Sequence, residues 1–341
     1  MKIYKLVLLG FGNVGQALAR LLLEKRSELQ HRYLTRFMVT AVATGTHGRA
    51  LNPNGIDLER ALEIIQSGGS LDELSPSSAP PDNLELIRAS GADVLFENTP
   101  VSYRDGQPAI SYIETALKNG MHAITANKGS VVHGYHSLTA LAAKHGLEFF
   151  FESTVMDGVP IFAAFRHMPA VNLSAIWGVL NSTTNLILSR MEAGDSFDKA
   201  VRHSQQIGIA ETDPSGDIEG WDAAVKLSAM ITVLMDHPFT PDLVDRTGIE
   251  SITPKMIAEA KAEGKRYKLV AHAWKEGEQF KAKVSPELVG PDSVLFNING
   301  STAIVQFESD VLGKLSFIEE DLGTRTTAYG LLADFINAVT E

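Results

Sequence analysis

The sequence of 341 residues contains no cysteine. It can therefore form no disulfide, no thiolate metal site and no cysteine-based covalent intermediate. Long apolar runs are also lacking, and the run Leu6 to Leu9 near the N-terminus is far too short for a signal peptide or a membrane span. Basic residues are fewer than acidic ones, and the formal net charge is −11. This balance argues against nucleic acid or anionic membranes as partners. Because neither a signal peptide nor a membrane span is predicted, we expect a cytoplasmic protein.

What is present is typical of a soluble globular protein, with 44% hydrophobic and 21% charged residues. The chain is too long for one simple core, so two domains are expected. Strands and helices alternate in the first part, which favours right-handed crossovers and a parallel sheet. We predict an α/β fold: a Rossmann-type parallel-sheet domain over residues 1–145, completed by a C-terminal helix at 315–341, and a mixed α+β domain over residues 146–314.

A glycine motif follows the first predicted strand, which runs from Ile3 to Leu9. The residues Gly10-Phe11-Gly12-Asn13-Val14-Gly15 match G-x-G-x-x-G, and helical periodicity begins directly after them. Gly10 would permit the tight turn, Gly12 the approach of a pyrophosphate, and Gly15 the packing of helix on strand. The motif predicts a dinucleotide site, with a glycine turn that binds no ligand as the alternative.

The residues after the second predicted strand, Phe37 to Ala43, bear on the choice of cofactor. They read Thr44-Gly45-Thr46-His47-Gly48-Arg49, with an arginine and without the acid that commonly binds the ribose of NAD. This favours NADP, with NAD as the alternative. Arg49 could equally be a solvated loop residue. Residues 66–81 are rich in Ser, Gly and Pro and are predicted to form an exposed, mobile loop.

Two further strands are predicted to end in polar residues. The strand over 92–97 leads to Asn98-Thr99-Pro100, and His122 to Thr125 leads to Asn127-Lys128. Ligands of open parallel sheets bind at the carboxyl ends of the strands, so Phe11, Thr99 and Lys128 are expected to meet there. The alternative for Lys128 is an ordinary surface lysine.

The second part of the chain carries an unusually acidic stretch, Glu211 to Lys226. Its glycines and proline predict a loop, and a helix is predicted from Trp221. Asp222 and Lys226 are four residues apart and would share one face of that helix. A solvated turn followed by an ordinary salt bridge is the alternative. Upstream we predict an aromatic strand over 148–154 and another over 175–180, after which Asn181 would cap a helix.

Several of these segments together resemble homoserine dehydrogenase, in the right order and over nearly the full chain. They are the glycine motif, Thr125-Ala126-Asn127-Lys128-Gly129, Val179 to Asn185, and Glu211 to Lys226. The resemblance implies reduction of L-aspartate 4-semialdehyde to L-homoserine with NADPH or NADH, in threonine and methionine biosynthesis. It also implies a homodimer built through the second domain. The chain resembles the short form without a C-terminal ACT regulatory domain, so threonine is not expected to inhibit through such a domain.

The resemblance also implies roles for individual residues. The catalytic residues would be Lys226, Asp222 and Lys128, and the substrate-binding residues Glu211 and Asp217. The cofactor would contact Gly10, Phe11, Gly12, Asn13, Val14, Gly15, Thr99, Lys128 and Gly323. A sodium ion would be held by the main-chain carbonyls of Glu152, Val155, Asp157 and Val159. The sequence departs from the family around Gly323 and in the turn Met156-Asp157-Gly158, where the family is richer in glycine.

Three other functions were weighed against this interpretation. Aspartate-semialdehyde dehydrogenase chemistry forms a thioester and is excluded, because the chain has no cysteine. A related NAD(P)-dependent reductase of another small amino or hydroxy acid remains open. A non-catalytic NADP-binding regulator also remains open, although Lys226, Asp222, Lys128 and Glu211 argue against it.

Overall fold

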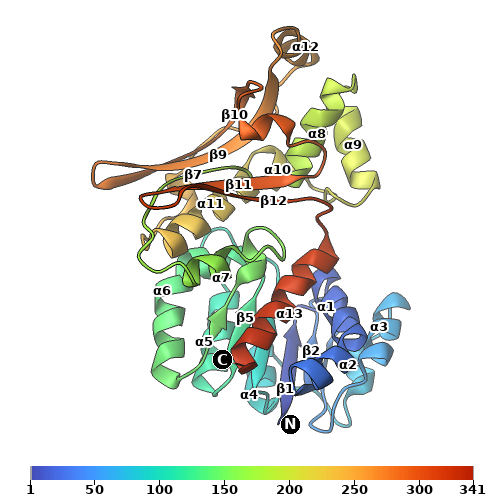
Figure 1. The fold of residues 1–341 in the computed structure, drawn as a ribbon. Helices are drawn as coiled ribbons and strands as arrows, with labels where there is room; N and C mark the ends of the chain where they lie inside the picture. The colour runs from blue at the N-terminus through green and yellow to red at the C-terminus, as the bar shows by residue number, and fades with distance from the viewer. Residues whose placement is uncertain (1, 341) are drawn as a thin grey trace. The chain divides into compact units, whose positions relative to one another are not determined.

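The computed structural model describes residues 2–340 and divides into two compact units (Figure 1). The first unit comprises the residues up to Pro160 together with those from Thr324 onward, and the second comprises Ile161–Gly323. Both boundaries therefore lie later than the predicted positions after residues 145 and 314. The second differs because residues 313–319 form a strand that pairs within the second unit, where the start of a helix was expected.

The first unit is built on a six-stranded sheet of order β3-β2-β1-β4-β5-β6. All neighbouring strands are parallel except β2 and β3, which confirms the predicted parallel sheet. The strands are β1 (Lys2–Leu9), β2 (Thr35–Ala43), β3 (Arg49–Leu51), β4 (Val94–Glu97), β5 (His122–Thr125) and β6 (Phe149–Phe150). The helices are α1 (Asn13–Glu24), α2 (Arg26–Arg32), α3 (Leu58–Gln66), α4 (Asn83–Ala89), α5 (Ala109–Lys118), α6 (Lys128–His145) and α13 (Thr324–Thr340).

Helices cover both faces of this sheet, which explains the unbroken apolar run in β1. Leu6 and Leu8 pack in a cluster that includes residues of α1, α3 and α13. Val7 and Leu9 point the other way and pack with residues of α4 and α5. Successive strand residues face opposite sides, so a strand buried on both sides must be apolar at every position.

Two segments of the first unit differ from the prediction. Residues 66–81 contain a 3₁₀ turn, Leu71–Leu74, whose Leu71 is fully buried and donates its N–H to the His47 carbonyl at 2.8 Å. The aromatic strand expected over 148–154 is limited to β6, and Glu152–Thr154 forms a 3₁₀ turn. Long-range contacts hold this turn: the Glu152 N–H donates to Asp334, and the Ser153 hydroxyl donates to the Thr327 carbonyl, both on α13.

The second unit is a mixed α+β domain, as predicted. Its six-stranded sheet has the order β12-β11-β7-β9-β10-β8, and all pairs are antiparallel except β8 with β10. The strands are β7 (Leu173–Val179), β8 (Asp245–Arg246), β9 (Arg266–Glu276), β10 (Gln279–Val289), β11 (Ala303–Ser309) and β12 (Gly313–Glu319). The helices are α7 (Ile161–Arg166), α8 (Ser182–Glu192), α9 (Phe197–Gln206), α10 (Ser215–Ile218), α11 (Trp221–Leu234) and α12 (Pro254–Ala262). Within residues 2–340, no helix is both long and apolar enough to cross a membrane.

Candidate active site

The glycine motif forms the turn between β1 and α1. Gly10 has a left-handed backbone, with φ +88°, and the N–H groups of Gly10 and Phe11 donate to the Ala43 carbonyl at 3.0 and 2.9 Å. A Cβ on Gly10 would lie 2.2 Å from the Asn98 carbonyl oxygen, and a Cβ on Gly15 would lie 2.5 Å from the Gly10 carbonyl oxygen. Both positions therefore require glycine.

The start of α1 fits the pyrophosphate of a dinucleotide. No side chain caps the helix, and its first turn contains no acid, so its backbone amides and the helix dipole suit an anion. A Cβ on Gly12 would have no atom within 4 Å, so the backbone is open to a ligand there. Among the described residues, the buried Asn98 Oδ1 has no hydrogen-bond partner and could accept from an N–H group of the cofactor.

The segments predicted to meet at the carboxyl ends of the strands do meet within the first unit. The Asn98 N–H donates to the Leu9 carbonyl at 2.8 Å. Asn127 Nδ2 donates to the Thr99 carbonyl at 3.0 Å, while Asn127 Oδ1 caps α6 by accepting from the Gly129 N–H at 3.1 Å. Lys128 is thus the first residue of α6, beside the Thr99 segment. The Phe11 side chain is buried in the core, which leaves its backbone for the turn.

Arg49 is more constrained than either interpretation of the sequence assumed. It lies on β3 opposite Ala43, and its guanidinium donates to the carbonyls of Pro80, at 3.1 Å, and Pro81. Its backbone N–H donates to Asp72 Oδ1 at 3.0 Å. Arg49 therefore lines a cavity of about 420 Å³ with Asp72 and residues 77–81.

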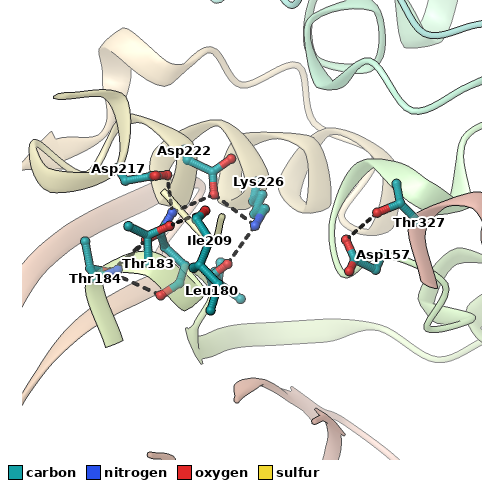
Figure 2. Close-up of polar contacts among 10 residues, drawn as sticks. Asp157, Leu180, Thr183, Thr184, Ile209, Asp217, Asp222, Lys226 and Thr327 are labelled. Carbon is teal, nitrogen blue, oxygen red and sulfur yellow. Dashed lines mark hydrogen bonds and ion pairs between the residues drawn. The ribbon is translucent and has the colours of Figure 1, made fainter. Parts of the chain in front are cut away.

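Lys226 and Asp222 form a buried ion pair in the second unit (Figure 2). Lys226 Nζ lies 2.9 Å from Asp222 Oδ2 and donates to the Leu180 carbonyl at 2.8 Å. Their side chains are 14% and 12% exposed, against 84% and 61% for the Lys255–Glu259 pair of α12, which has the same spacing. A solvated salt bridge does not describe this pair.

The helix α11 explains why this pair is well placed for chemistry. Most of the helix is buried, so a charged pair within it is unusual. Asp222 lies in the first turn, where the helix dipole stabilises a carboxylate. An ammonium has three N–H donors, and Leu180 and Asp222 take two of them. The third can donate to the oxygen of a bound substrate.

Asn181 is a site residue that the sequence identified only as a helix cap. Its Oδ1 accepts from the Thr184 N–H at 2.8 Å and so caps α8. Its Nδ2 donates to Asp217 Oδ1 at 2.6 Å and to Asp222 Oδ2 at 3.0 Å. An amide can cap the helix as an acceptor and still donate to two carboxylates. The residue type thus allows the bridge, but nothing in the sequence indicates that both carboxylates lie within reach.

Asp217 lies in the same hydrogen-bonded network, at the short helix α10 that replaces part of the predicted acidic loop. Burial raises the pKa of its carboxyl, and the charge of Asp222 raises it further. Hydrogen bonds from Asn181 and Thr183, and the charge of Lys226, act in the opposite direction. The net effect is a raised pKa, so Asp217 becomes protonated at a higher pH than an exposed aspartate does.

The remaining predicted residues lie outside these two networks. Glu211 is exposed, and its main-chain carbonyl accepts from Gln205. Gly323 directly precedes α13. In the proposed sodium turn, Asp157 has φ +41°, and its carboxylate accepts from the Thr326 hydroxyl at 2.8 Å. It also accepts from the Thr327 hydroxyl at 3.0 Å (Figure 2). Residues 2–340 contain no group of three or more His, Asp or Glu side chains placed to hold a metal.

Comparisons with known proteins cover both units of the chain. The family model for the homoserine dehydrogenase NAD-binding domain matches residues 10–152, and the homoserine dehydrogenase model matches residues 160–336. Homoserine dehydrogenase of Methanocaldococcus jannaschii is 34% identical over 97% of this chain and 97% of its own. The NAD(+)-dependent homoserine dehydrogenase of Pseudomonas canavaninivorans is 32% identical, over 98% of this chain and 96% of its own. A hyperthermophilic archaeal homoserine dehydrogenase solved in complex with NADPH has a TM-score of 0.81 at 28% identity, over 99% of this chain and 98% of that chain.

The glycine turn, the parallel sheet and the matched NAD-binding domain define an NAD(P)-dependent oxidoreductase. The matches extend through the second unit as well. The chain belongs to the homoserine dehydrogenase family, whose members interconvert L-homoserine and L-aspartate 4-semialdehyde.

Proposed function

We propose that Lys226 donates the proton in this reaction and that Asp222 holds it in place. The single observation that carries the proposal is the largely enclosed Lys226 ammonium, 14% exposed and anchored by Leu180 and Asp222 with one donor remaining. A bound nicotinamide cofactor supplies or accepts the hydride. As the aldehyde carbon is reduced, its oxygen gains negative charge, which a positioned ammonium stabilises and then protonates.

The substrate is held, in this proposal, by the charges of the acidic stretch. Asp217 and Glu211 would bind the α-ammonium through charge-assisted hydrogen bonds. Lys128, at the start of α6, is the proposed partner for the nicotinamide and the α-carboxylate. The initial test is spectrophotometric turnover of L-homoserine with NADP and with NAD. A folded protein that binds cofactor but oxidises no homoserine would contradict the proposal and favour a non-catalytic regulator.

Substrate binding should depend on pH through Asp217. Because its pKa is raised above the ordinary 3.8, Asp217 becomes neutral on acidification at a higher pH than an exposed aspartate. The KM for homoserine should therefore rise as the pH falls through the Asp217 pKa, and kcat/KM should fall. Asp217→Asn should have a high KM at every pH and lack this acidic limb.

The matched control is Asp213→Asn, because Asp213 lies in the same stretch but is exposed, with its pKa lowered by hydrogen bonds from Ser215. That variant should keep the wild-type pH profile. An acidic limb that persists in Asp217→Asn would remove Asp217 from substrate binding.

The preferred cofactor is proposed to be NADP, because no acid follows β2 and Arg49 lies at β3. Relatives differ on this point: one is named NAD(+)-dependent, and another was solved with NADPH. Arg49→Ala should lower the ratio of kcat/KM for NADP to that for NAD, since the 2′-phosphate would lose a cation. Arg60→Ala, an exposed arginine of α3 paired with Glu63, is the control. An unchanged ratio would leave Arg49 as a support for residues 80–81 only.

A homodimer through the second unit is proposed from its sheet. Phe307 faces Phe165 of α7, so the neighbouring Gln306 and its partner Trp177 lie on the opposite face. On that face the His272 ring stacks between two tryptophan rings, with centroid distances of 4.4 Å to Trp177 and 4.6 Å to Trp274. Ile318 lies on the same face and is 55% exposed. An apolar row of this kind suits burial against a second copy. Light scattering that gives the mass of one chain, 36.9 kDa, would contradict it.

The sodium site is proposed on the resemblance alone, through the carbonyls of Glu152, Val155, Asp157 and Val159. Its measurement is the midpoint of thermal unfolding in sodium against a matched concentration of tetramethylammonium. Equal midpoints would remove the site from the proposal.

A further inference from the structure

Glu97 is a fully buried carboxyl at the end of β4, and the chemistry above does not use it. One carboxylate oxygen accepts from the Thr99 N–H at 2.8 Å and from the Thr99 hydroxyl. The other accepts from the Thr125 hydroxyl at 2.8 Å. Buried carboxyl groups are rare, and burying one costs free energy unless it is hydrogen-bonded. The three hydrogen bonds to Glu97 offset that cost and fix the position of its side chain.

The hydrogen bonds of Glu97 belong to a closed ring. Thr125 Oγ1 accepts from the Asn127 N–H at 2.9 Å, and Asn127 Nδ2 donates to the Thr99 carbonyl at 3.0 Å. The ring Glu97–Thr99–Asn127–Thr125 therefore ties the segment after β4 to the segment after β5. These are the two segments that carry Thr99 and Lys128.

The ring also bears on the glycine turn. The Asn98 carbonyl, between two ring residues, packs so closely on Gly10 that a Cβ there would lie 2.2 Å away. A shift of the 98–100 segment would therefore displace Gly10, or open a gap beside it. One buried side chain is thus linked, through hydrogen bonds and close packing, to three segments of the proposed cofactor site.

We propose that Glu97 is a positioning residue for the cofactor, which holds the Thr99 and Lys128 segments in register with the glycine turn. The inference rests on the proposed cofactor site. It assigns Glu97 no contact with substrate or cofactor and no part in proton transfer. Its effect is geometric: it holds the binding groups in place. Small displacements of such groups strongly lower affinity and rate.

A geometric role makes a specific prediction about glutamine. In Glu97→Gln the amide oxygen can still accept from Thr99, and the amide nitrogen can donate to Thr125 Oγ1. The Thr125 hydroxyl can then donate to the main-chain carbonyl of residue 97, which it already approaches at 2.9 Å. The ring survives without the acid, so glutamine should rescue the function that alanine loses.

The experiment measures the Kd of NADPH by fluorescence titration, together with kcat, KM and the midpoint of thermal unfolding. Glu97→Ala and Thr125→Val should each weaken NADPH binding by about tenfold, with a smaller change in the homoserine KM at saturating cofactor. Glu97→Gln should stay within about twofold of the wild type. Ser90→Ala is the control, because it removes a buried hydroxyl that bonds to Ile87 and precedes β4. It should lower the unfolding midpoint without changing the Kd.

Two results would overturn the inference. One is a folded Glu97→Ala with wild-type NADPH affinity. The other is a loss of affinity that merely follows the loss of stability across all variants, including Ser90→Ala. If Glu97→Ala does not fold, Thr125→Val decides, since it keeps the acid and removes one link of the ring. A wild type that binds no NADPH would refute the proposed cofactor site itself, which is a different outcome.

Discussion

Lys226→Met is expected to lower kcat by about 10²–10⁴-fold, the usual contribution of a positioned general acid, while NADPH affinity stays near that of the wild type. Methionine keeps much of the apolar length of lysine but removes the ammonium that Leu180 and Asp222 hold. The developing charge on the substrate oxygen then has neither a cation nor a proton donor. Pre-steady-state hydride transfer and NADPH titration would measure the two effects separately.

The ion pair also contributes to stability, which the measurement must separate from catalysis. Removing one partner of a buried pair leaves the other uncompensated, so the unfolding midpoint of Lys226→Met should fall. Asn181 Nδ2 still donates to Asp222, which limits the loss. Assays well below the midpoint isolate the catalytic effect. Lys255→Met removes a lysine of the same spacing from an exposed pair on α12 and should leave both quantities unchanged. A Lys226→Met variant with wild-type kcat would refute the assignment.

Gly12→Ala is expected to raise the Kd of NADPH by at least about tenfold, or about 1.4 kcal/mol, without destabilising the protein. Gly12 has φ −84°, which alanine tolerates, and its Cβ would have no protein atom within 4 Å. The new methyl group would instead occupy the space into which the pyrophosphate approaches. NADPH titration and thermal unfolding would measure the affinity and the stability.

Variants at two other glycines serve as controls for Gly12→Ala. Gly290→Ala adds a methyl group in the second unit, again with no atom within 4 Å, and should change neither quantity. Gly10→Ala should destabilise the fold itself, because its φ is +88° and its Cβ would meet Asn98 and Thr99. Wild-type NADPH affinity in Gly12→Ala would mean that the cofactor does not lie over the glycine turn.

The sequence by itself determined the features whose causes are local. The glycine motif predicted the turn after β1, because backbone angle and close approach are properties of single residues. The alternation of strands and helices predicted the parallel sheet of the first unit. Asn181 was recognisable as a helix cap, and four-residue spacing placed Asp222 and Lys226 on one helix face. The roles that the resemblance assigns to these residues remain predictions.

Only the tertiary structure decided the features that depend on partners far along the chain. Three predictions were wrong: an exposed loop around Leu71, a longer strand at β6, and a helix that includes residues 315–319. Pairing and burial at these places come from residues that are distant in sequence. The bridge from Asn181 to two carboxylates and the ring around Glu97 had no signal in spacing, since each joins separate strands and helices. Whether a charge is buried is likewise a property of the packed fold. It distinguishes Lys226, 14% exposed, from Lys255, 84% exposed, although both are lysines paired with an acid four residues away.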